Sequence, residues 1–141
     1  MPAVADSSFL ISLLEGERWA EEFWRKVVKG EERVFISTVS IAMAASNLWR
    51  AGAGVQVDVL VAALKRALGA SIVLFDLNLA LETGRLMHST NVDLECASTV
   101  TIALLKRCST LLTRNEMLVK LAEKYGLKAS SMWGKNASKG G

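Results

Sequence analysis

The chain has 141 residues, of which 51% are hydrophobic and 22% charged, and its formal net charge is +3. This composition is typical of one globular domain and excludes an intrinsically disordered chain. No apolar run approaches the roughly 20 residues that a membrane span needs, and the first residues lack the pattern of a secretory signal, so we expect a cytoplasmic protein with no membrane segment.

The first predicted strand ends at Asp6, and a helix follows it at once. Apolar residues recur at helical spacing over residues 9–14, and Gly16 ends the pattern. A carboxylate at the end of a strand lies at the sheet edge where α/β proteins bind ligands, and Ser7 and Ser8 beside it suit a hydrated cation. The alternative is that Asp6 or Ser7 only caps the helix.

The rest of the sequence alternates strands with helices. Further strands are predicted at residues 33–37, 71–75 and 110–113, with a short edge strand at residues 127–129. Helices are predicted at residues 17–29, 39–50, 55–68, 77–87, 94–107 and 115–125, with a polar connection at residues 88–92. Thr38 or Ser40 is the expected cap of the helix at residues 39–50. The alternation requires crossover connections, so it predicts an α/β fold with a mostly parallel sheet of four or five strands.

One domain is expected over residues 1–129. Residues 130–141 are rich in Ser, Gly and Lys and are predicted to form a flexible tail. The net charge is −2 over residues 1–64 and +5 over residues 65–141. A basic half is compatible with a phosphate-bearing partner, although solvated helix faces explain the asymmetry equally well.

The usual residues of zinc and nucleophilic sites are scarce. Cys96 and Cys108 would lie about 18 Å apart on one continuous helix, which excludes a disulfide between them unless that helix breaks. His88 is the only histidine and lies in a polar stretch. A structural zinc site and a catalytic triad are therefore not expected.

Three segments of the sequence resemble a PIN domain, and among PIN domains the small prokaryotic toxin-type ribonucleases called VapC. The segments are AVADSSFLISLLEG near the start, FISTVSIA before the helix at residues 39–50, and LLTRNEMLVKLAEKYGLKA near the end. The resemblance covers about residues 3–129. It implies a three-layer α/β/α fold with a central, mostly parallel sheet. It also implies acidic residues at the carboxyl edge of the sheet that bind Mg²⁺ or Mn²⁺, which activates water to cleave RNA.

The acidic positions of the family are only partly kept in this sequence. The first acid matches Asp6, and the small polar residue two positions later matches Ser8. The second acid falls on Met43, the third on Ala97, and the fourth, after a Thr-Arg pair, on Asn115. A thioether is a poor ligand for a hard cation, so three of four expected acids are absent.

Neighbouring residues are candidates to replace the missing acids. In a divergent nuclease Asp6 would be the principal metal ligand and Asn115 a neutral ligand or water positioner. Asp93, one turn before Ala97 on the same helix face, or Glu95 within that first turn, would be a second acid. The alternative is that Asp93 caps its helix and Glu95 complements the helix dipole.

Candidate RNA contacts lie beside this site. Ser8 and the Thr113 hydroxyl are placed near Asp6 by the resemblance, and Arg114 is a candidate phosphate contact. Lys106 and Arg107 are also basic and near the predicted sheet edge, although cations are common at helix ends.

Two functions follow from this pattern. One is a catalytically weakened or inactive PIN module that binds RNA or protein, and the other is a divergent endoribonuclease that uses Mg²⁺ or Mn²⁺, so the sequence leaves enzymatic activity open. The resemblance further implies an antitoxin-like protein partner and a homodimer.

Overall fold

The computed structural model describes residues 2–130, which form one five-stranded parallel sheet and seven helices. The strands are β1 (Ala3–Ala5), β2 (Val34–Ser37), β3 (Ala70–Val73), β4 (Thr110–Leu112) and β5 (Lys128–Ser130). The helices are α1 (Ser7–Leu14), α2 (Arg18–Lys29), α3 (Thr38–Arg50), α4 (Gly54–Arg66), α5 (Leu77–Thr90), α6 (Leu94–Leu105) and α7 (Glu116–Lys124). The strand order β3-β2-β1-β4-β5 places β1 at the centre.

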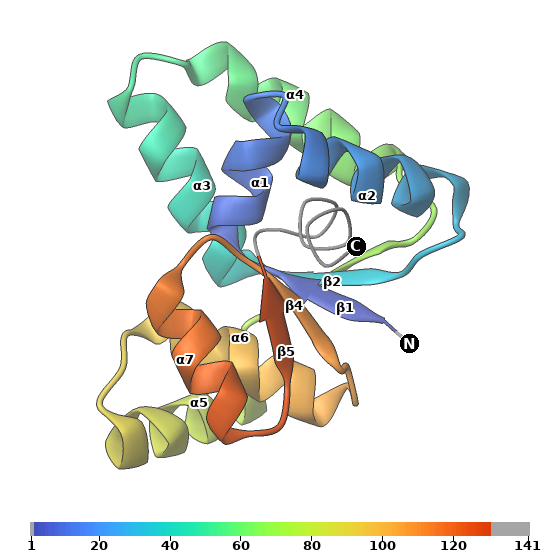
Figure 1. Ribbon diagram of the computed structural model, residues 1–141. Coiled ribbons are helices and arrows are strands. Elements are labelled where there is room, and N and C mark those ends of the chain that lie inside the picture. Colours follow the sequence, from blue (N-terminus) through green and yellow to red (C-terminus); the bar gives the residue numbers. More distant parts are fainter. Residues whose placement is uncertain (1, 131–141) are drawn as a thin grey trace.

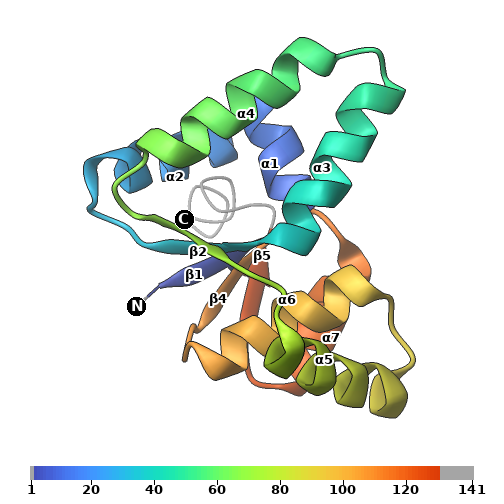
Figure 2. The same ribbon diagram turned by 180° about the vertical axis from the view of Figure 1, so that it is seen from behind.

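Helices cover both faces of the sheet, which confirms the predicted three-layer α/β/α fold. Helices α1 to α4 lie on one face and α5 to α7 on the other (Figure 1), and the same division is visible from behind (Figure 2). Every residue of β1 is buried because the sheet is covered on both sides. On the first face, the ring of Phe9 packs edge-on against Trp19 and Phe23, with centroids 5.5 Å and 6.0 Å apart.

The register of the strands determines which residues meet at the carboxyl edge. Ala5, the last residue of β1, pairs with a residue of β2 on one side and with the last residue of β4 on the other. The next residues along the three strands, Asp6, Ser37 and Thr113, therefore lie side by side. Parallel strands thus bring the segments that resemble a PIN domain to one edge.

Several predicted boundaries differ from those observed. The cap of α3 is Ser37, whose side chain accepts a hydrogen bond from the Ser40 backbone, and not Thr38 or Ser40. The predicted polar connection at residues 88–92 is wrong over its first half, because α5 continues to Thr90 and ends at Asn91 in a left-handed conformation. The last predicted strand is real and is β5.

The C-terminal tail, membrane spans and the cysteines were also subjects of sequence predictions. The predicted tail at residues 130–141 lies, apart from Ser130, outside the described residues, so the domain limit at residue 129 stays a prediction. Within residues 2–130, no helix is long and apolar enough to cross a membrane. Both cysteines are free, as the sequence predicts, and the structure shows that both are buried.

Candidate functional site at the carboxyl edge

Asp6 is the centre of the carboxyl edge, and both of its carboxylate oxygens accept hydrogen bonds from protein donors. It caps α1, since Oδ1 accepts a hydrogen bond from the Phe9 backbone at 3.1 Å. The Ser8 hydroxyl donates to the same oxygen at 2.6 Å, and the Thr113 hydroxyl donates to Oδ2 at 2.5 Å. Only 2% of Asp6 is exposed. The carboxylate therefore joins the start of α1 to the end of β4.

Burial dominates the ionisation of Asp6. It raises the pKa of Asp6 to about 6, and the negative charge of Glu95 adds to the rise, while the hydrogen bonds from Ser8, Thr113 and the Phe9 backbone oppose it. Three donors do not offset the loss of water around a carboxylate. At neutral pH the charged form of Asp6 is therefore less favourable in the folded state than in water.

Glu95 reaches the same edge from the first turn of α6. Its two carboxylate oxygens accept hydrogen bonds from the Ser7 backbone and the Ser7 hydroxyl, each at 2.8 Å. Ser7 is the first residue of α1, so Glu95 satisfies a free N–H at that helix start and also complements the dipole of α1. The expectation that Glu95 serves the dipole of its own helix misses this contact.

Asp93 and Asn115 act as helix caps. Asp93 Oδ1 accepts a hydrogen bond from the Cys96 backbone at 2.8 Å, and Asn115 Oδ1 accepts one from the Met117 backbone at 3.0 Å. The Asn115 amide also donates to Cys96 Sγ at 3.4 Å. Burial, together with the nearby Asp93 carboxylate, raises the pKa of Cys96 to about 12, so this thiol stays protonated. The capping interpretation of Asp93 is confirmed.

The predicted RNA contacts also bond internally. The Ser8 hydroxyl accepts a hydrogen bond from the Arg114 backbone at 2.7 Å. The Arg114 guanidinium lies 3.2 Å from the Ser12 hydroxyl and forms ion pairs with Glu15 and Glu17 at 3.5 Å and 3.0 Å. These contacts pin the loop after β4 to the end of α1. The roles of Ser8, Thr113 and Arg114 toward RNA stay predictions.

The donor set at this edge does not fit a hard dication. Such a cation takes six or more oxygen ligands, several of them charged. Met43 and Ala97 offer no oxygen in their side chains, and the oxygens of Asp6, Glu95 and Asn115 already accept hydrogen bonds. Within the described part of the chain, no group of three or more His, Cys, Asp or Glu side chains is placed to hold a metal ion.

Sequence reasoning missed two members of this edge. Ser7 was considered only as a cap or as a polar neighbour of Asp6, and Cys96 was considered only for disulfides and zinc. Their roles depend on how α6 packs beside β1, and nothing in the local sequence signals that packing. The spacing of Asp93 before a helical run did signal a cap.

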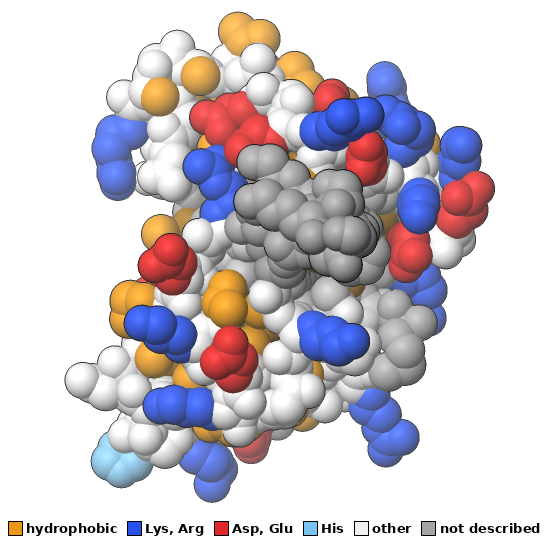
Figure 3. Space-filling model, viewed as in Figure 1, with side chains coloured by type: hydrophobic (Ala, Val, Ile, Leu, Met, Phe, Trp, Pro, Cys, Tyr) orange, Lys and Arg blue, Asp and Glu red, His pale blue; other side chains and the backbone are white. Residues whose placement is uncertain are grey.

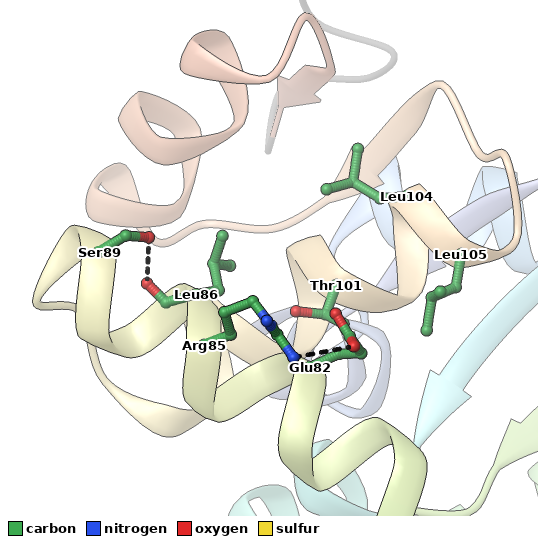
Figure 4. A pocket seen from close by; sticks show the side chains of 7 residues that line it. All are labelled: Glu82, Arg85, Leu86, Ser89, Thr101, Leu104 and Leu105. Atoms are coloured by element: carbon green, nitrogen blue, oxygen red, sulfur yellow. Dashed lines mark hydrogen bonds and ion pairs between the residues drawn. The ribbon is translucent and has the colours of Figure 1, made fainter.

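Two hollows lined by described residues lie away from this edge. One, of about 200 Å³, lies between α5 and α6 and is lined by residues such as Leu86, Leu104 and Leu105 (Figure 4). Glu82 and Arg85 at its rim form an ion pair at 3.7 Å. No residue of the carboxyl edge named above lines it. This hollow is therefore not part of the candidate site.

Comparisons with known proteins agree with the fold. The family model of the PIN domain matches residues 3–124. The similar solved structures include VapC20 from Mycobacterium tuberculosis, a sarcin-ricin loop cleaving toxin; VapBC2 from Rickettsia felis, bound to a DNA fragment from its promoter; and a toxin-antitoxin complex from Klebsiella pneumoniae. None of the curated proteins matches the chain.

The three structural matches are close in shape and distant in sequence. VapC20 gives a TM-score of 0.70 at 11% identity and covers 84% of this chain and 94% of its own. VapBC2 gives a TM-score of 0.68 at 14% identity and covers 92% of this chain and 98% of its own. The Klebsiella complex gives a TM-score of 0.62 at 19% identity and covers 83% of this chain and 89% of its own. At these identities the likeness shows a shared fold.

Proposed function

We propose, since this chain belongs to the PIN domain family, that it is a VapC-like member in which metal-dependent RNA cleavage is weakened or lost and which acts as an RNA- or protein-binding module. One observation carries the proposal. Asp6 and Glu95 are the two carboxylates that interact at the centre of the edge, and each is bonded by protein donors. A hard dication would have to displace those donors and would gain few charged oxygens.

The test is to restore the missing acids and measure Mn²⁺ binding by calorimetry. The parent chain is expected to show no saturable Mn²⁺ binding below about 1 mM, a range in which well-formed carboxylate sites bind. The double variant Met43→Glu/Asn115→Asp adds two carboxylates without touching the buried Ala97. It is expected to bind Mn²⁺ at least about tenfold more tightly, because each added charge strengthens the site.

The matched control adds charge elsewhere. Val55→Glu/Asn115→Asp adds the same two charges, but Val55 lies on α4 and is 77% exposed. It should bind Mn²⁺ no better than Asn115→Asp alone. Saturable binding by the parent chain that disappears in Asp6→Asn and in Glu95→Gln would overturn the proposal.

The competing function is a divergent Mg²⁺- or Mn²⁺-dependent endoribonuclease, the toxin of a toxin-antitoxin pair. One observation supports it: Glu95 bonds Ser7, the residue next to Asp6, and its charge contributes to the raised pKa of Asp6. In that case Asp6 and Glu95 would hold the metal and Asn115 would position a ligand. Cleavage of RNA that needs Mn²⁺ and is lost in Glu95→Gln would establish it.

A protein partner is also part of the proposal. Two of the similar structures contain a toxin together with its antitoxin, which supports an antitoxin-like partner for this chain. Exposed apolar residues offer a surface for such a contact. Trp49 at the end of α3 is 62% exposed, and Val55 and Val59 on α4 are 77% and 47% exposed.

We further propose a homodimer formed through the outer side of α5 and α6. Leu77 and Leu81, one turn apart on α5, are 75% and 62% exposed, and Leu105 at the end of α6 is 52% exposed. Sedimentation equilibrium should give a dimer for the parent chain and a monomer for Leu77→Lys/Leu81→Lys. Val55→Lys, on the other face of the molecule, should remain dimeric. A monomeric parent would contradict the proposal.

A further inference from the structure

The amino edge of the sheet, where the strands begin, carries exposed cations. Arg33 directly precedes β2, Lys106 and Arg107 lie between α6 and β4, and Lys128 is the first residue of β5. We call these four residues the amino-edge cluster. All four are exposed, and none forms an ion pair with another described residue of the chain. Figure 3 shows Lys and Arg side chains along the side of the molecule from which β1 starts, with some acidic side chains among them.

Two of these cations lie over the same aromatic ring. The Arg33 guanidinium lies 5.8 Å and the Lys106 ammonium 5.6 Å from the centroid of the half-buried Phe35 ring. Both distances allow a cation–π interaction. Burial raises the pKa of Cys108, and the charges of Arg33 and Lys106 oppose that rise, so both cations also lie close to the same thiol. Two long side chains from different parts of the chain thus converge on one place.

Arg107 contributes a cation at a position that favours glycine. Its φ angle is 55°, in the left-handed region, where helices commonly end with Gly. The neighbouring Lys106 is the C-cap of α6. The chain therefore keeps a basic side chain at this turn although a glycine would adopt the conformation more easily.

We propose that the amino-edge cluster binds the phosphate backbone of single-stranded RNA. Phosphate oxygens accept hydrogen bonds from Arg and Lys, and a guanidinium held over an aromatic ring offers a flat surface for a base to stack on. The Phe35 ring brings Arg33 and Lys106 together, so one RNA strand could contact both cations. This surface is distinct from Asp6 and does not depend on metal binding there.

The test is fluorescence anisotropy with the full chain and a labelled oligouridylate of about 12 nucleotides, in EDTA at about 50 mM salt. The parent chain should bind. Arg33→Gln/Lys106→Gln should weaken binding about tenfold, and the slope of log affinity against log salt should fall by about 1.4, since each phosphate contact with a single strand contributes about 0.7.

A matched control removes the same two charges from elsewhere. Arg50→Gln/Lys120→Gln loses one Arg and one Lys from the exposed ends and faces of α3 and α7, and should weaken binding less than about twofold. Equal weakening in both variants, or no binding by the parent, would overturn the proposal. A third outcome would also overturn it: the parent binds phosphatidylserine vesicles but not the oligouridylate, and vesicle binding is lost in Arg33→Gln/Lys106→Gln. EDTA keeps the result independent of any metal site at Asp6.

Discussion

The two edges of the sheet treat their charged groups in opposite ways. At the carboxyl edge, Asp6 and Glu95 accept hydrogen bonds from protein donors, and Arg114 is paired with two acids. At the amino edge, Arg33 and Lys106 are exposed, lie over an aromatic ring and form no ion pair with another described residue. The edge with the family's acidic position is closed by its own hydrogen bonds, and the opposite edge offers charge to solvent.

The edge that resembles the metal site of the family is therefore not the edge best suited to bind a ligand. A polar group that is already bonded inside the protein must lose that bond before it can take a ligand, whereas an exposed cation loses only water. The hydrogen bonds around Asp6 are therefore expected to stabilise the fold, and the amino-edge cluster is expected to bind RNA. Three substitutions test the comparison, the first two at the carboxyl edge and the third at the amino edge.

The largest effect is expected for Thr113→Val. The change keeps the shape of the side chain but removes the donor to Asp6 Oδ2 and the acceptor of the Asn115 backbone N–H. Removing a hydrogen bond to a buried charged group should lower the free energy of unfolding by about 2–3 kcal/mol at neutral pH. The loss should be smaller at about pH 4, where Asp6 is protonated. Urea denaturation at both pH values measures it.

A buried threonine without a partner provides the control. Thr83 is fully buried on α5, and its hydroxyl has no hydrogen-bond partner among the described residues. Thr83→Val should therefore leave stability unchanged or raise it, because no bond is lost. If Thr83→Val lost as much stability as Thr113→Val, the bond to Asp6 would not be the source of the effect.

A smaller effect of opposite sign is expected for Asp6→Asn. The pKa of Asp6 in the folded chain is raised to about 6, so the folded state binds the proton more tightly than the unfolded state. The stability that this proton provides is present below the unfolded pKa of 3.8 and is lost as pH rises through about 6. Asn removes the buried charge and keeps an acceptor for the Phe9 backbone. It should raise the free energy of unfolding by about 1–2 kcal/mol at neutral pH.

The pH dependence distinguishes this cause from a general effect of Asn at a cap. The gain in Asp6→Asn should vanish at about pH 4, where the parent is protonated. Asp76 caps α5 by accepting a hydrogen bond from the Leu79 backbone, but it is exposed. Asp76→Asn should not raise the free energy of unfolding at neutral pH, because it removes a carboxylate that is not buried. A constant difference between Asp6→Asn and the parent would contradict the argument from burial.

The sequence was sufficient to predict the fold because its signals are local and repeated. Helical spacing, Gly16 and Gly30 at helix ends, and the alternation of strands with helices lead to a parallel sheet without any tertiary information. The cap at Ser37 was missed because Ser37, Thr38 and Ser40 are all suitable caps. The end of α5 was missed because its last polar residues lie on an exposed face.

The site was predicted less completely because it depends on contacts between distant segments. The contact of Glu95 with Ser7 joins residues 88 positions apart and requires α6 to start beside α1. Lys106, Arg107 and Arg114 were placed near one sheet edge, and this was wrong for the first two. Lys106 precedes β4 and Arg114 follows it, so a parallel sheet puts them at opposite edges. This order was readable in the sequence.

The smallest effect is expected for Arg107→Gly at the amino edge. The φ angle of 55° disfavours a residue with a Cβ, so glycine should raise the free energy of unfolding by about 1 kcal/mol. Asn91 has the same φ angle, and Asn91→Gly should gain only a few tenths of a kcal/mol because Asn tolerates this conformation. If the amino-edge cluster binds RNA, Arg107→Gly should also weaken oligouridylate binding while Asn91→Gly does not. A variant that is more stable yet binds less would show that this edge keeps a cation at the expense of stability, and unchanged affinity would remove Arg107 from the cluster.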